Sequence, residues 1–402
     1  MFEDKLSAGA KAFGSSALAG IFALLEEPDL ISFGGGFPDP SWFIPEIAEI
    51  TSQVLATDAG KALQYCTVPG IRPLREFLAE RSVKMGIKGL EAPNVLITAG
   101  SLQGLDLVCR VFLNPGDVVI TEGPTYVGAI ECFHCHQARV ETVPLDDDGV
   151  DLQALDDLLR RLEREGKPAK LFYTVPSFQN PSGATMSDER RRKLVETASR
   201  HGLPVVEDNA YSELCYEGAP PPAIKAFDQE GLVISLGTFS KIFAPGVRLG
   251  WIIASPDLIE RFILFKQIAD QCSGSLGQVM ALECGRRGLI ETQIARSVEA
   301  LKVKAAATLK AIEDYFPPGS EHTVPVGGFY TWVTVDERLD LHTLMPRIVK
   351  EVRVGYVTGT VFYPDGRGRR QARLSYSLPP VELIPVGLKR LGEFLSEELA
   401  RA

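Results

Sequence analysis

Short apolar runs alternate with helical patterns between residues 46 and 255, and this alternation limits the possible folds more than any other feature of the chain. The runs expected to form strands are NVLITAG, DVVITEG, ARVETVPL, KLFYTVP, LPVVEDNA, GLVISLG and LGWIIAS. Segments with helical periodicity, such as SLQGLDLVCRVFL and DLQALDDLLRRLEREG, lie between several of them. Near-continuous apolar strands joined by helices are typical of a mostly parallel sheet covered on both faces, so we predict an α/β fold. In such sheets, ligands bind beyond the carboxyl ends of the strands.

The pattern changes near residue 256, where long helical segments replace the alternation. Helices are expected at 257–272 and 292–315, followed by strands in GGFYTWVTV and ARLSYSL and a closing helix in VELIPVGLKRLGEFLSEEL. These elements predict a smaller α+β domain. The N-terminal residues hold an expected short helix in ALAGIFALL and the glycine-rich SFGGGFPDP, and we expect them to join the second domain or to lie over the cleft. The predicted boundaries are 1–45 for the N-terminal segment, 46–290 for the large domain and 291–402 for the small domain.

Charge and cysteine content exclude several classes of function. The 402 residues carry a formal net charge of −10, so no electrostatic attraction to nucleic acid or to an anionic membrane is expected. Seven scattered cysteines, an odd number, indicate reduced thiols and a cytoplasmic protein rather than a disulfide framework. No apolar run reaches the roughly 20 residues that span a bilayer.

A lysine follows one of the expected strands directly, in TFSKIFAPGVRLGW. Lysines are usually kept at surfaces because burying an unpaired ammonium group is costly, yet Lys241 lies at the mouth of a buried sheet. Ser240 precedes it, and Arg248 follows seven positions later. Arginine offers a planar fork that suits phosphate oxygens, whereas the pKa of a lysine shifts readily on burial. For Lys241 taken alone, a surface ion pair is the more common explanation.

Polar groups also follow the other expected strands. The turn before Ser101 opens a helix whose first amides suit a phosphate, although Ser101 could simply cap that helix. Asn180 precedes a proline and could simply mark a turn. Asp208 follows apolar residues, so its carboxylate would be partly desolvated and would need a cationic partner, although a polar loop is the alternative.

One ligand would satisfy all of these groups together, namely a phosphorylated pyridine aldehyde. Lys241 would form a Schiff base with the aldehyde, which requires that its amine be neutral at some stage. Asp208 would face the ring nitrogen and keep it protonated, so that the ring becomes an electron sink. The remaining expected contacts are Asn180 and Tyr211 with the ring oxygen, Tyr126 with the ring face, and Ser101, Leu102, Gln103, Ser240 and Arg248 with the phosphate.

The order of the motifs AGSLQGLD, EGPTY, QNPSG, EDNAYSEL, TFSKIFAPGVRLGW and ARLSYS resembles the class I/II aminotransferases of fold type I, which use pyridoxal 5'-phosphate. The resemblance covers nearly the whole chain and is strongest to the 2-aminoadipate and kynurenine aminotransferase branch. It implies that Lys241 is the Schiff-base lysine and also moves a proton, with Asp208 and Tyr126 as further catalytic residues. It implies that Arg373 binds the substrate α-carboxylate, although a solvated edge-strand charge is the alternative reading of Arg373. The other implied substrate contacts are Gly35, Gly36 and Asn180.

The resemblance also carries an expectation about assembly. Tyr65, in LQYCTVPG, matches a tyrosine that reaches the phosphate of the neighbouring subunit's cofactor, so a homodimer with shared active sites is implied. The substrates implied are an L-amino acid and a 2-oxo acid such as 2-oxoglutarate. The donor could be 2-aminoadipate, glutamate, a branched-chain or an aromatic amino acid. The N-terminal SSALAGIFALL lacks the arginine expected to pair with an acidic side chain, and this favours an apolar or aromatic donor.

Two alternative functions use the same residues. A lyase would employ the same cofactor for elimination or decarboxylation, because the cofactor supplies the electronics in both cases. A ligand-sensing module related to transcriptional regulators is a more remote alternative, since the chain starts directly at the enzyme portion. Two further motifs are set aside: ECFHCHQ (131–137), where a helix should spread the cysteines and histidines around its faces so that no metal site is expected, and RRRK (190–193), interpreted as a solvated helix face.

Overall fold

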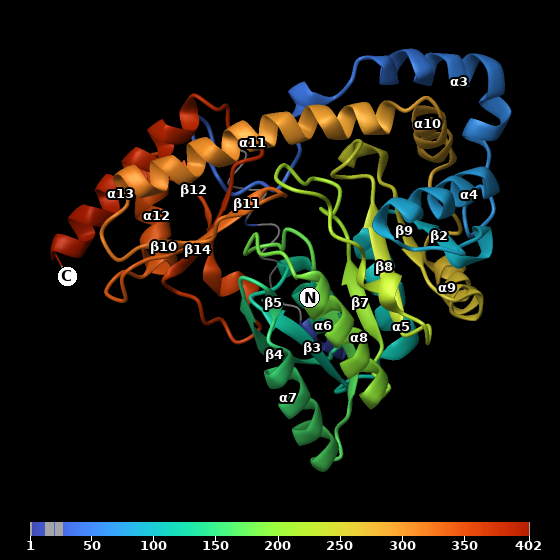
Figure 1. Cartoon of the computed structure of the whole chain (residues 1–402), viewed down its shortest axis with the longest axis horizontal. Coiled ribbons are helices and arrows are strands. Elements are labelled where there is room, and N and C mark those ends of the chain that lie inside the picture. The colour runs from blue at the N-terminus through green and yellow to red at the C-terminus, as the bar shows by residue number, and fades with distance from the viewer. Residues whose placement is uncertain (1, 13–19, 21–26, 402) are drawn as a thin grey trace.

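The larger part of the molecule is built on an eight-stranded sheet (Figure 1). The computed structural model describes residues 2–12, 20 and 27–401. The strands of the large sheet are β2 (Val95–Thr98), β3 (Val118–Gly123), β4 (Arg139–Asp146), β5 (Gly149–Val150), β6 (Ala169–Thr174), β7 (Val205–Asp208), β8 (Val233–Thr238) and β9 (Gly250–Ile253). Their order across the sheet is β2-β9-β8-β7-β6-β3-β4-β5.

Most neighbouring strands in this sheet are parallel. The pairs from β8 through β7, β6 and β3 to β4 are parallel, whereas β9 runs antiparallel to both β2 and β8, and β5 forms a hairpin with β4. All seven expected strands are present, and the predicted α/β fold with a mostly parallel sheet is confirmed.

Helices cover both faces of the large sheet. Successive side chains of a strand point to opposite faces, and because these strands are apolar throughout, both faces need to be covered. Val118 and Ile120 of β3 face a core formed with the leucines of α7 (Leu152–Arg164) and with α8 (Asp188–His201). Val119, between them, faces the opposite core, to which α5 (Ser101–Phe112) and α6 (Val127–Cys135) contribute. Local signals set the helix ends: the Asp151 side chain accepts a hydrogen bond from the Ala154 amide at the start of α7, and Gly202 ends α8 in the left-handed conformation.

Further helices link the large sheet to the smaller part of the molecule. The 27-residue helix α11 (Leu289–Tyr315) extends along both parts (Figure 1). The other helices of this region are α3 (Glu46–Leu63), α4 (Arg72–Arg81), α9 (Pro256–Ala269) and α10 (Ser275–Arg286), and α10 packs on both α3 and α4. The expected helices at 257–272 and 292–315 correspond to α9 and α11, whereas α10 was not predicted.

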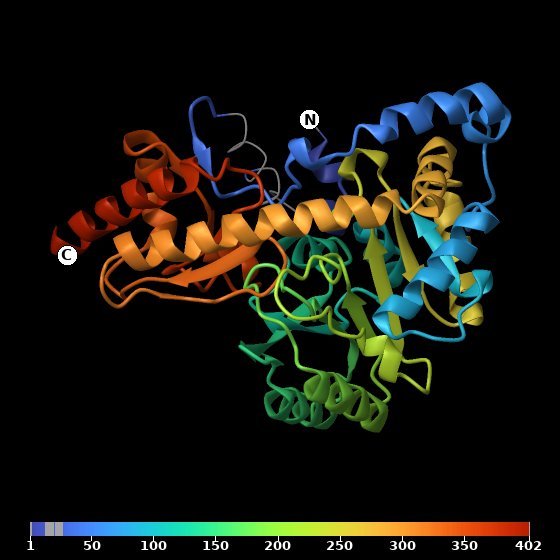
Figure 2. The same ribbon diagram turned by 45° about the horizontal axis from the view of Figure 1, so that its top comes forward.

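The smaller part contains a four-stranded antiparallel sheet of order β10-β11-β14-β13, with β10 (Glu321–His322), β11 (Tyr330–Thr334), β13 (Val357–Thr358) and β14 (Gln371–Ser375). Two helices, α12 (Leu341–Glu351) and α13 (Leu383–Arg401), belong to the same part. Strand β1 (Ile31–Ser32) pairs in parallel with β12 (Val354–Gly355), so the N-terminal residues extend beside this part (Figure 2). The exact domain boundaries remain a prediction.

The remaining described elements are short. They are α1 (Ala8–Ala12) and single 3₁₀ turns at Glu3–Lys5, Pro40–Trp42, Ser82–Met85, Ala92–Asn94, Ile224–Phe227, Pro245–Val247 and Gly359–Phe362. The helix expected in ALAGIFALL falls at 17–25, outside the described residues apart from Gly20. Among the described helices, none is both long enough and apolar enough to cross a membrane.

Candidate active site

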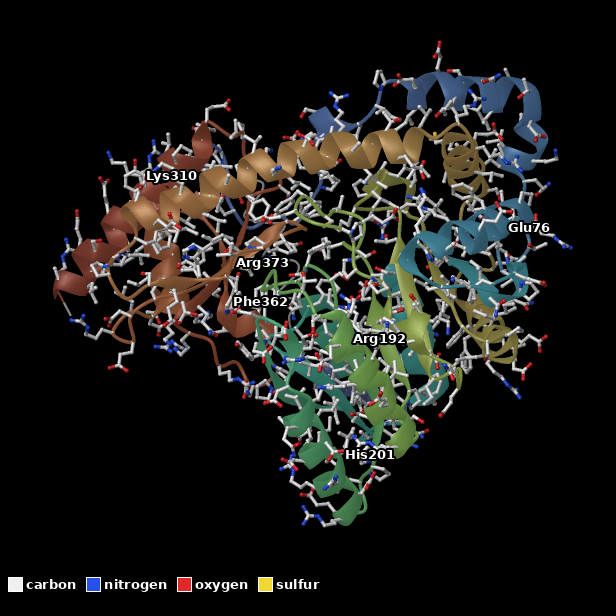
Figure 3. All side chains as sticks on the ribbon, in the orientation of Figure 1. Glu76, Arg192, His201, Lys310, Phe362 and Arg373 are labelled. Carbon is white, nitrogen blue, oxygen red and sulfur yellow. The ribbon has the colours of Figure 1, made fainter. Side chains whose placement is uncertain are left out.

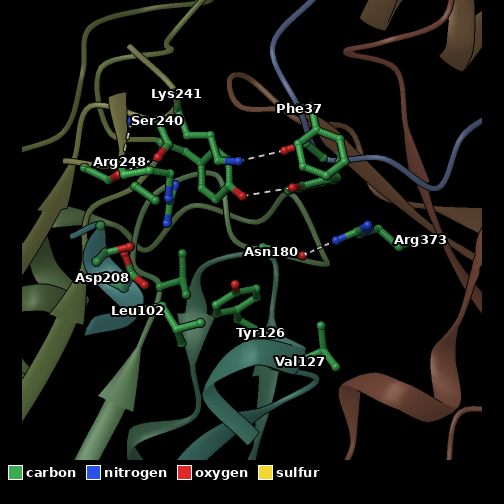
Figure 4. A pocket seen from close by; sticks show the side chains of 18 residues that line it. Phe37, Leu102, Tyr126, Val127, Asn180, Asp208, Ser240, Lys241, Arg248 and Arg373 are labelled. Atoms are coloured by element: carbon green, nitrogen blue, oxygen red, sulfur yellow. Dashed lines mark hydrogen bonds between the residues drawn. The ribbon is translucent and has the colours of Figure 1, made fainter. Parts of the chain in front are cut away.

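A cavity of about 250 Å³ lies at the carboxyl ends of the parallel strands, where a ligand site was expected (Figure 4). Strands β2, β3, β6, β7 and β8 each lead into it. Because β9 is antiparallel, its beginning lies at the same edge and brings in Arg248. The residues that line the cavity are Gly36, Phe37, Gly100, Ser101, Leu102, Tyr126, Val127, Val175, Asn180, Asp208, Ala210, Tyr211, Thr238, Ser240, Lys241, Arg248, Tyr330 and Arg373.

Lys241 is held inside this cavity rather than at the surface. Its Nζ donates a hydrogen bond of 2.7 Å to the carbonyl oxygen of Gly36 and lies 5.9 Å from the centre of the Tyr211 ring. Burial and the nearby Arg373 guanidinium together lower the pKa of Lys241 to about 8, against the opposing effect of Asp208. A substantial share of this amine is therefore neutral near pH 8, as a nucleophile or a proton acceptor must be.

Asp208 presents a carboxylate oxygen that lacks a partner. Its Oδ2 accepts a hydrogen bond of 3.0 Å from the Tyr173 hydroxyl, whereas Oδ1 is buried without a hydrogen-bond partner among the described residues. Burial raises the pKa of Asp208, the Tyr173 hydrogen bond offsets part of this rise, and the net value is about 6. An unpaired buried carboxylate oxygen is costly, so this position is suited to a ligand that brings an N–H group.

Another part of the cavity is suited to an anion. Helix α5 begins there at Ser101, immediately after Gly100, whose φ of +96° favours glycine, and the first amides of a helix lack internal partners. Ser240 and Arg248 lie beside this helix start (Figure 4). A Cβ at Gly250 would lie 2.6 Å from the Ser101 nitrogen, so only glycine lets β9 pass this close to the turn.

Arg373 reaches the cavity from β14 of the smaller sheet (Figure 3). It is 3% exposed, its Nη1 donates to Asn180 Oδ1 at 2.9 Å, and its Nη2 donates to the Gly34 carbonyl at 2.5 Å. Its Nε is buried without a hydrogen-bond partner among the described residues. The solvated-charge alternative for Arg373 is therefore wrong, and the buried guanidinium keeps further N–H groups, that of Nε among them, for a planar anion such as a carboxylate.

Tyr330 is a lining residue that the sequence reasoning missed. It lies on β11, and its hydroxyl makes a hydrogen bond of 2.9 Å with the hydroxyl of Tyr211. Its ring lies 4.5 Å from the Arg373 guanidinium. In the sequence, Tyr330 is one aromatic residue of an apolar strand and carries no signal of its own. It could have been identified only from the pairing of its strand with the strand that carries Arg373.

Three predicted site residues do not line the cavity. The Gln103 side chain accepts from the Ala99 amide at 2.7 Å and donates to Asp270 at 2.8 Å, so it supports the turn before α5. Gly35 lies beside Gly36 but does not line the cavity. Tyr65 is 75% exposed, and its contact with a neighbouring subunit remains a prediction.

Two motifs that were set aside differ from their interpretation. The expectation that a helix spreads the residues of ECFHCHQ around its faces is wrong for Cys132 and His136, because residues four apart share a helix face, and both lie together with Cys109. The interpretation of RRRK as a solvated face is wrong for Arg191, which is 0% exposed and donates to buried carbonyl groups of Met186 and Pro176.

The cavity residues fit a phosphorylated pyridine aldehyde. The orphaned Oδ1 of Asp208 suits a protonated ring nitrogen, the amine of Lys241 suits an aldehyde, and the start of α5 suits a phosphate. These three groups belong to different strands of one sheet and meet only at its carboxyl edge.

Comparisons with known proteins agree with this chemistry. The sequence model of the family described as aminotransferase class I and II matches residues 29–383. The aromatic-amino-acid aminotransferase 1 of Thermococcus litoralis is 40% identical over 100% of this chain and 96% of the relative. The 2-aminoadipate transaminase of Thermus thermophilus is 36% identical, with 99% of this chain and 98% of the relative covered. The crystal structure of Pyrococcus horikoshii kynurenine aminotransferase in complex with PMP aligns with a TM-score of 0.94 and 40% identity, covering 99% of this chain and 98% of that one.

Proposed function

Because the chain belongs to the class I and II aminotransferases, we propose that it transfers the amino group of an aromatic or aliphatic L-amino acid to a 2-oxo acid such as 2-oxoglutarate. It is an amino-acid aminotransferase that uses pyridoxal 5'-phosphate. That cofactor, when bound, supplies an electron sink that stabilises negative charge at the substrate α-carbon. The observation that carries the proposal is the convergence of Lys241, the unpaired Oδ1 of Asp208 and the buried Arg373 on one cavity.

The residues of the chain would divide the work as follows. Arg373 binds the substrate α-carboxylate with its fork and orients the α-hydrogen toward Lys241. Lys241, with its pKa near 8, accepts and returns that proton. Asp208 pairs with the ring nitrogen and keeps it protonated.

The preference for an aromatic or aliphatic donor rests on the walls of the cavity. Phe37, Tyr126, Val127 and Tyr330 contribute apolar and aromatic surface, and Arg373 is the one basic side chain of the smaller sheet that lines the cavity within the described part of the chain. The relative from Thermococcus litoralis is named for aromatic amino acids, which supports the same choice.

The test compares donors with the purified holoenzyme. We expect kcat/KM with phenylalanine, tyrosine or leucine and 2-oxoglutarate to exceed that with 2-aminoadipate by at least tenfold. Lys241→Ala should lose turnover with every donor. Arg373→Lys should raise KM roughly 10- to 100-fold for all donors alike, because a point charge replaces a bidentate fork worth about 1.5–3 kcal/mol.

Three outcomes would each overturn a part of this proposal. A preference for 2-aminoadipate would refute the donor class while leaving transamination intact. Release of ammonia and pyruvate without any 2-oxo acid would instead support the lyase alternative. Turnover by Lys241→Ala equal to that of the parent would refute the assignment of Lys241.

We also infer that the enzyme is a homodimer in which Tyr65 reaches the partner's cofactor phosphate. Tyr65 and Leu63 are 75% and 70% exposed, and Ile268 of α9 is 84% exposed. The segment around Tyr65 lies against the residues that follow α9, since Ser275 Oγ donates to the Gln64 carbonyl at 2.7 Å. Light scattering after size exclusion should give the mass of two chains, and Tyr65→Phe should weaken cofactor retention without changing that mass; a monomer that retains full activity would refute this inference.

A cytoplasmic location is proposed on the state of the cysteines. All seven are free thiols, as expected in a reducing compartment.

A further inference from the structure

A cluster of two thiols and one imidazole lies between α5 and α6, apart from the cavity. Cys109 of α5 is 0% exposed, Cys132 of α6 is 9% exposed, and their sulfur atoms are 3.9 Å apart. His136 follows the end of α6, and one of its ring nitrogens lies within 4.8 Å of both sulfur atoms. Residues 132 and 136 are four apart, so one face of α6 presents both side chains toward Cys109.

We propose that Cys109, Cys132 and His136 bind one Zn²⁺ ion, with a water molecule in the fourth position. Zinc prefers tetrahedral coordination by cysteine sulfur at about 2.3 Å and histidine nitrogen at about 2.0–2.1 Å. These bond lengths place two sulfur ligands roughly 3.8 Å apart, which agrees with the observed 3.9 Å. The same geometry places nitrogen and sulfur ligands about 3.6 Å apart, so the imidazole nitrogen, now within 4.8 Å of both sulfur atoms, has to approach them. The His136 side chain, at the helix end, is partly exposed.

The surroundings of His136 are those of a metal ligand. Its Nε2 lies 2.8 Å from Oδ1 of Asp106, which also pairs with Arg110 at 2.7 Å. A carboxylate on one ring nitrogen fixes the ring and directs the other nitrogen to the metal, an arrangement that recurs around ligating histidines. Nδ1 is therefore the nitrogen left for zinc, and Asp106 is a positioning residue.

Charge and access also favour the ion. Two thiolates neutralise Zn²⁺, so the complex carries no net charge in a mostly buried place. Each cysteine loses one proton to solvent when its Zn–S bond forms, and the partly exposed His136 marks the route of entry.

Buried free cysteines often serve only as small apolar side chains. Here, however, a hydrogen-bonded imidazole has a ring nitrogen within 4.8 Å of both thiols, and an apolar role for the cysteines does not require that neighbour. The motif ECFHCHQ also provides matched controls on the same helix, since Cys135 and His134 carry the same chemistry outside the cluster.

The experiment uses the reduced holoenzyme, freed of metal by a chelator and then titrated with Zn²⁺ in competition with a chromogenic chelator. We expect one high-affinity Zn²⁺ per chain above the level of the Cys109→Ala/Cys132→Ala double variant, and release of two protons per ion. Cys132→Ala and His136→Ala should each lower the affinity at least tenfold. Cys135→Ala and His134→Ala should bind Zn²⁺ as tightly as the parent. Asp106→Asn should lower the Zn²⁺ affinity 10- to 100-fold.

A second readout keeps the test decisive if a cysteine variant fails to fold. Cd²⁺ added to the parent protein should give the ultraviolet absorption of thiolate-to-metal charge transfer. The proposal is overturned when the parent shows no such band, when it binds no more Zn²⁺ than the double variant, or when the matched controls lose as much affinity as Cys132→Ala and His136→Ala.

Discussion

The contact between Gly36 and Tyr330 allows a quantitative test of how the cavity is packed. A Cβ added at Gly36 would lie 2.0 Å from the Tyr330 hydroxyl oxygen and 3.0 Å from its Cζ, whereas an ordinary contact begins at about 3.4 Å. Tyr330 is 1% exposed, and its hydroxyl is bound to Tyr211 at 2.9 Å, so it has little freedom to retreat. Gly36→Ala should therefore displace the hydroxyl and break that hydrogen bond.

The expected magnitude follows from these two effects. Overpacking a tight core costs about 1–3 kcal/mol, and the lost hydrogen bond adds about 1 kcal/mol. We expect Gly36→Ala to lower the free energy of unfolding by about 2–4 kcal/mol and Tyr330→Phe by about 1 kcal/mol. The double variant lacks the clashing oxygen, so its free energy of unfolding should fall by less than that of Gly36→Ala alone. The coupling energy between the two substitutions should be about 1–3 kcal/mol.

Urea unfolding of the apoenzyme at one fixed protein concentration measures this cycle, and the cofactor dissociation constant of each variant gives a second reading. Gly60→Ala is the control, because nothing lies within 4 Å of the Cβ it would add, and it should be neutral or stabilising by up to about 1 kcal/mol. Strictly additive effects of Gly36→Ala and Tyr330→Phe would refute the packing described above.

Three further predictions concern buried charges. For Lys241, with its pKa near 8, the rate at which apoenzyme takes up pyridoxal 5'-phosphate should rise with pH and level off above about pH 8; a rate still rising tenfold per unit up to pH 10 would contradict the lowered pKa. Burial raises the pKa of Glu122 to about 7 from an ordinary 4.5, so the carboxyl binds its proton more tightly in the folded protein. The free energy of unfolding should therefore fall by up to about 3 kcal/mol as pH rises from about 4.5 to 7. Urea titrations at several pH values should show that Glu122→Gln flattens this pH dependence. An unchanged dependence in the variant would mean that other groups cause it. Arg191→Leu should lower the free energy of unfolding by roughly 3 kcal/mol or more in the same assay, because buried carbonyl groups lose their donors. The control Lys193→Ala, at an exposed position, should lower it by less than about 0.5 kcal/mol. Similar losses in the two variants would refute the role of burial.

Most of the sheet could be predicted because its strands are apolar on both faces, and such runs stand out from the amphipathic helices between them. The residues at the strand ends could be predicted for the same reason, since Lys241 and Asp208 each interrupt an apolar pattern. Helix α10 was missed because its residues lack a marked apolar stripe, and it buries small and polar side chains such as Ser275 and Gln278.

The errors share a different cause, which is that tertiary neighbours decide the role of a side chain. Arg191 belongs to a basic run, and only the carbonyl groups of two loops around it explain its burial. Cys132 and His136 form a cluster only because Cys109, twenty-three residues earlier, faces them from another helix. The Gln103 side chain, by contrast, is held by Asp270 from a distant segment, and a contact between Gln103 and the phosphate stays a prediction.

The position of Arg373 within its sheet has a consequence for how such chains can change. Arg373 pairs with Trp332 on one side and with Val357 on the other, so the ladder holds it from both directions. Since neighbours along a strand point to opposite faces, inserting one residue within β14 would move the guanidinium to the far face and put Leu374 or Ala372 in the cavity. Insertions and deletions can therefore accumulate in the loop before Gln371 without moving the Arg373 guanidinium out of the cavity, whereas within the strand only substitutions keep it there.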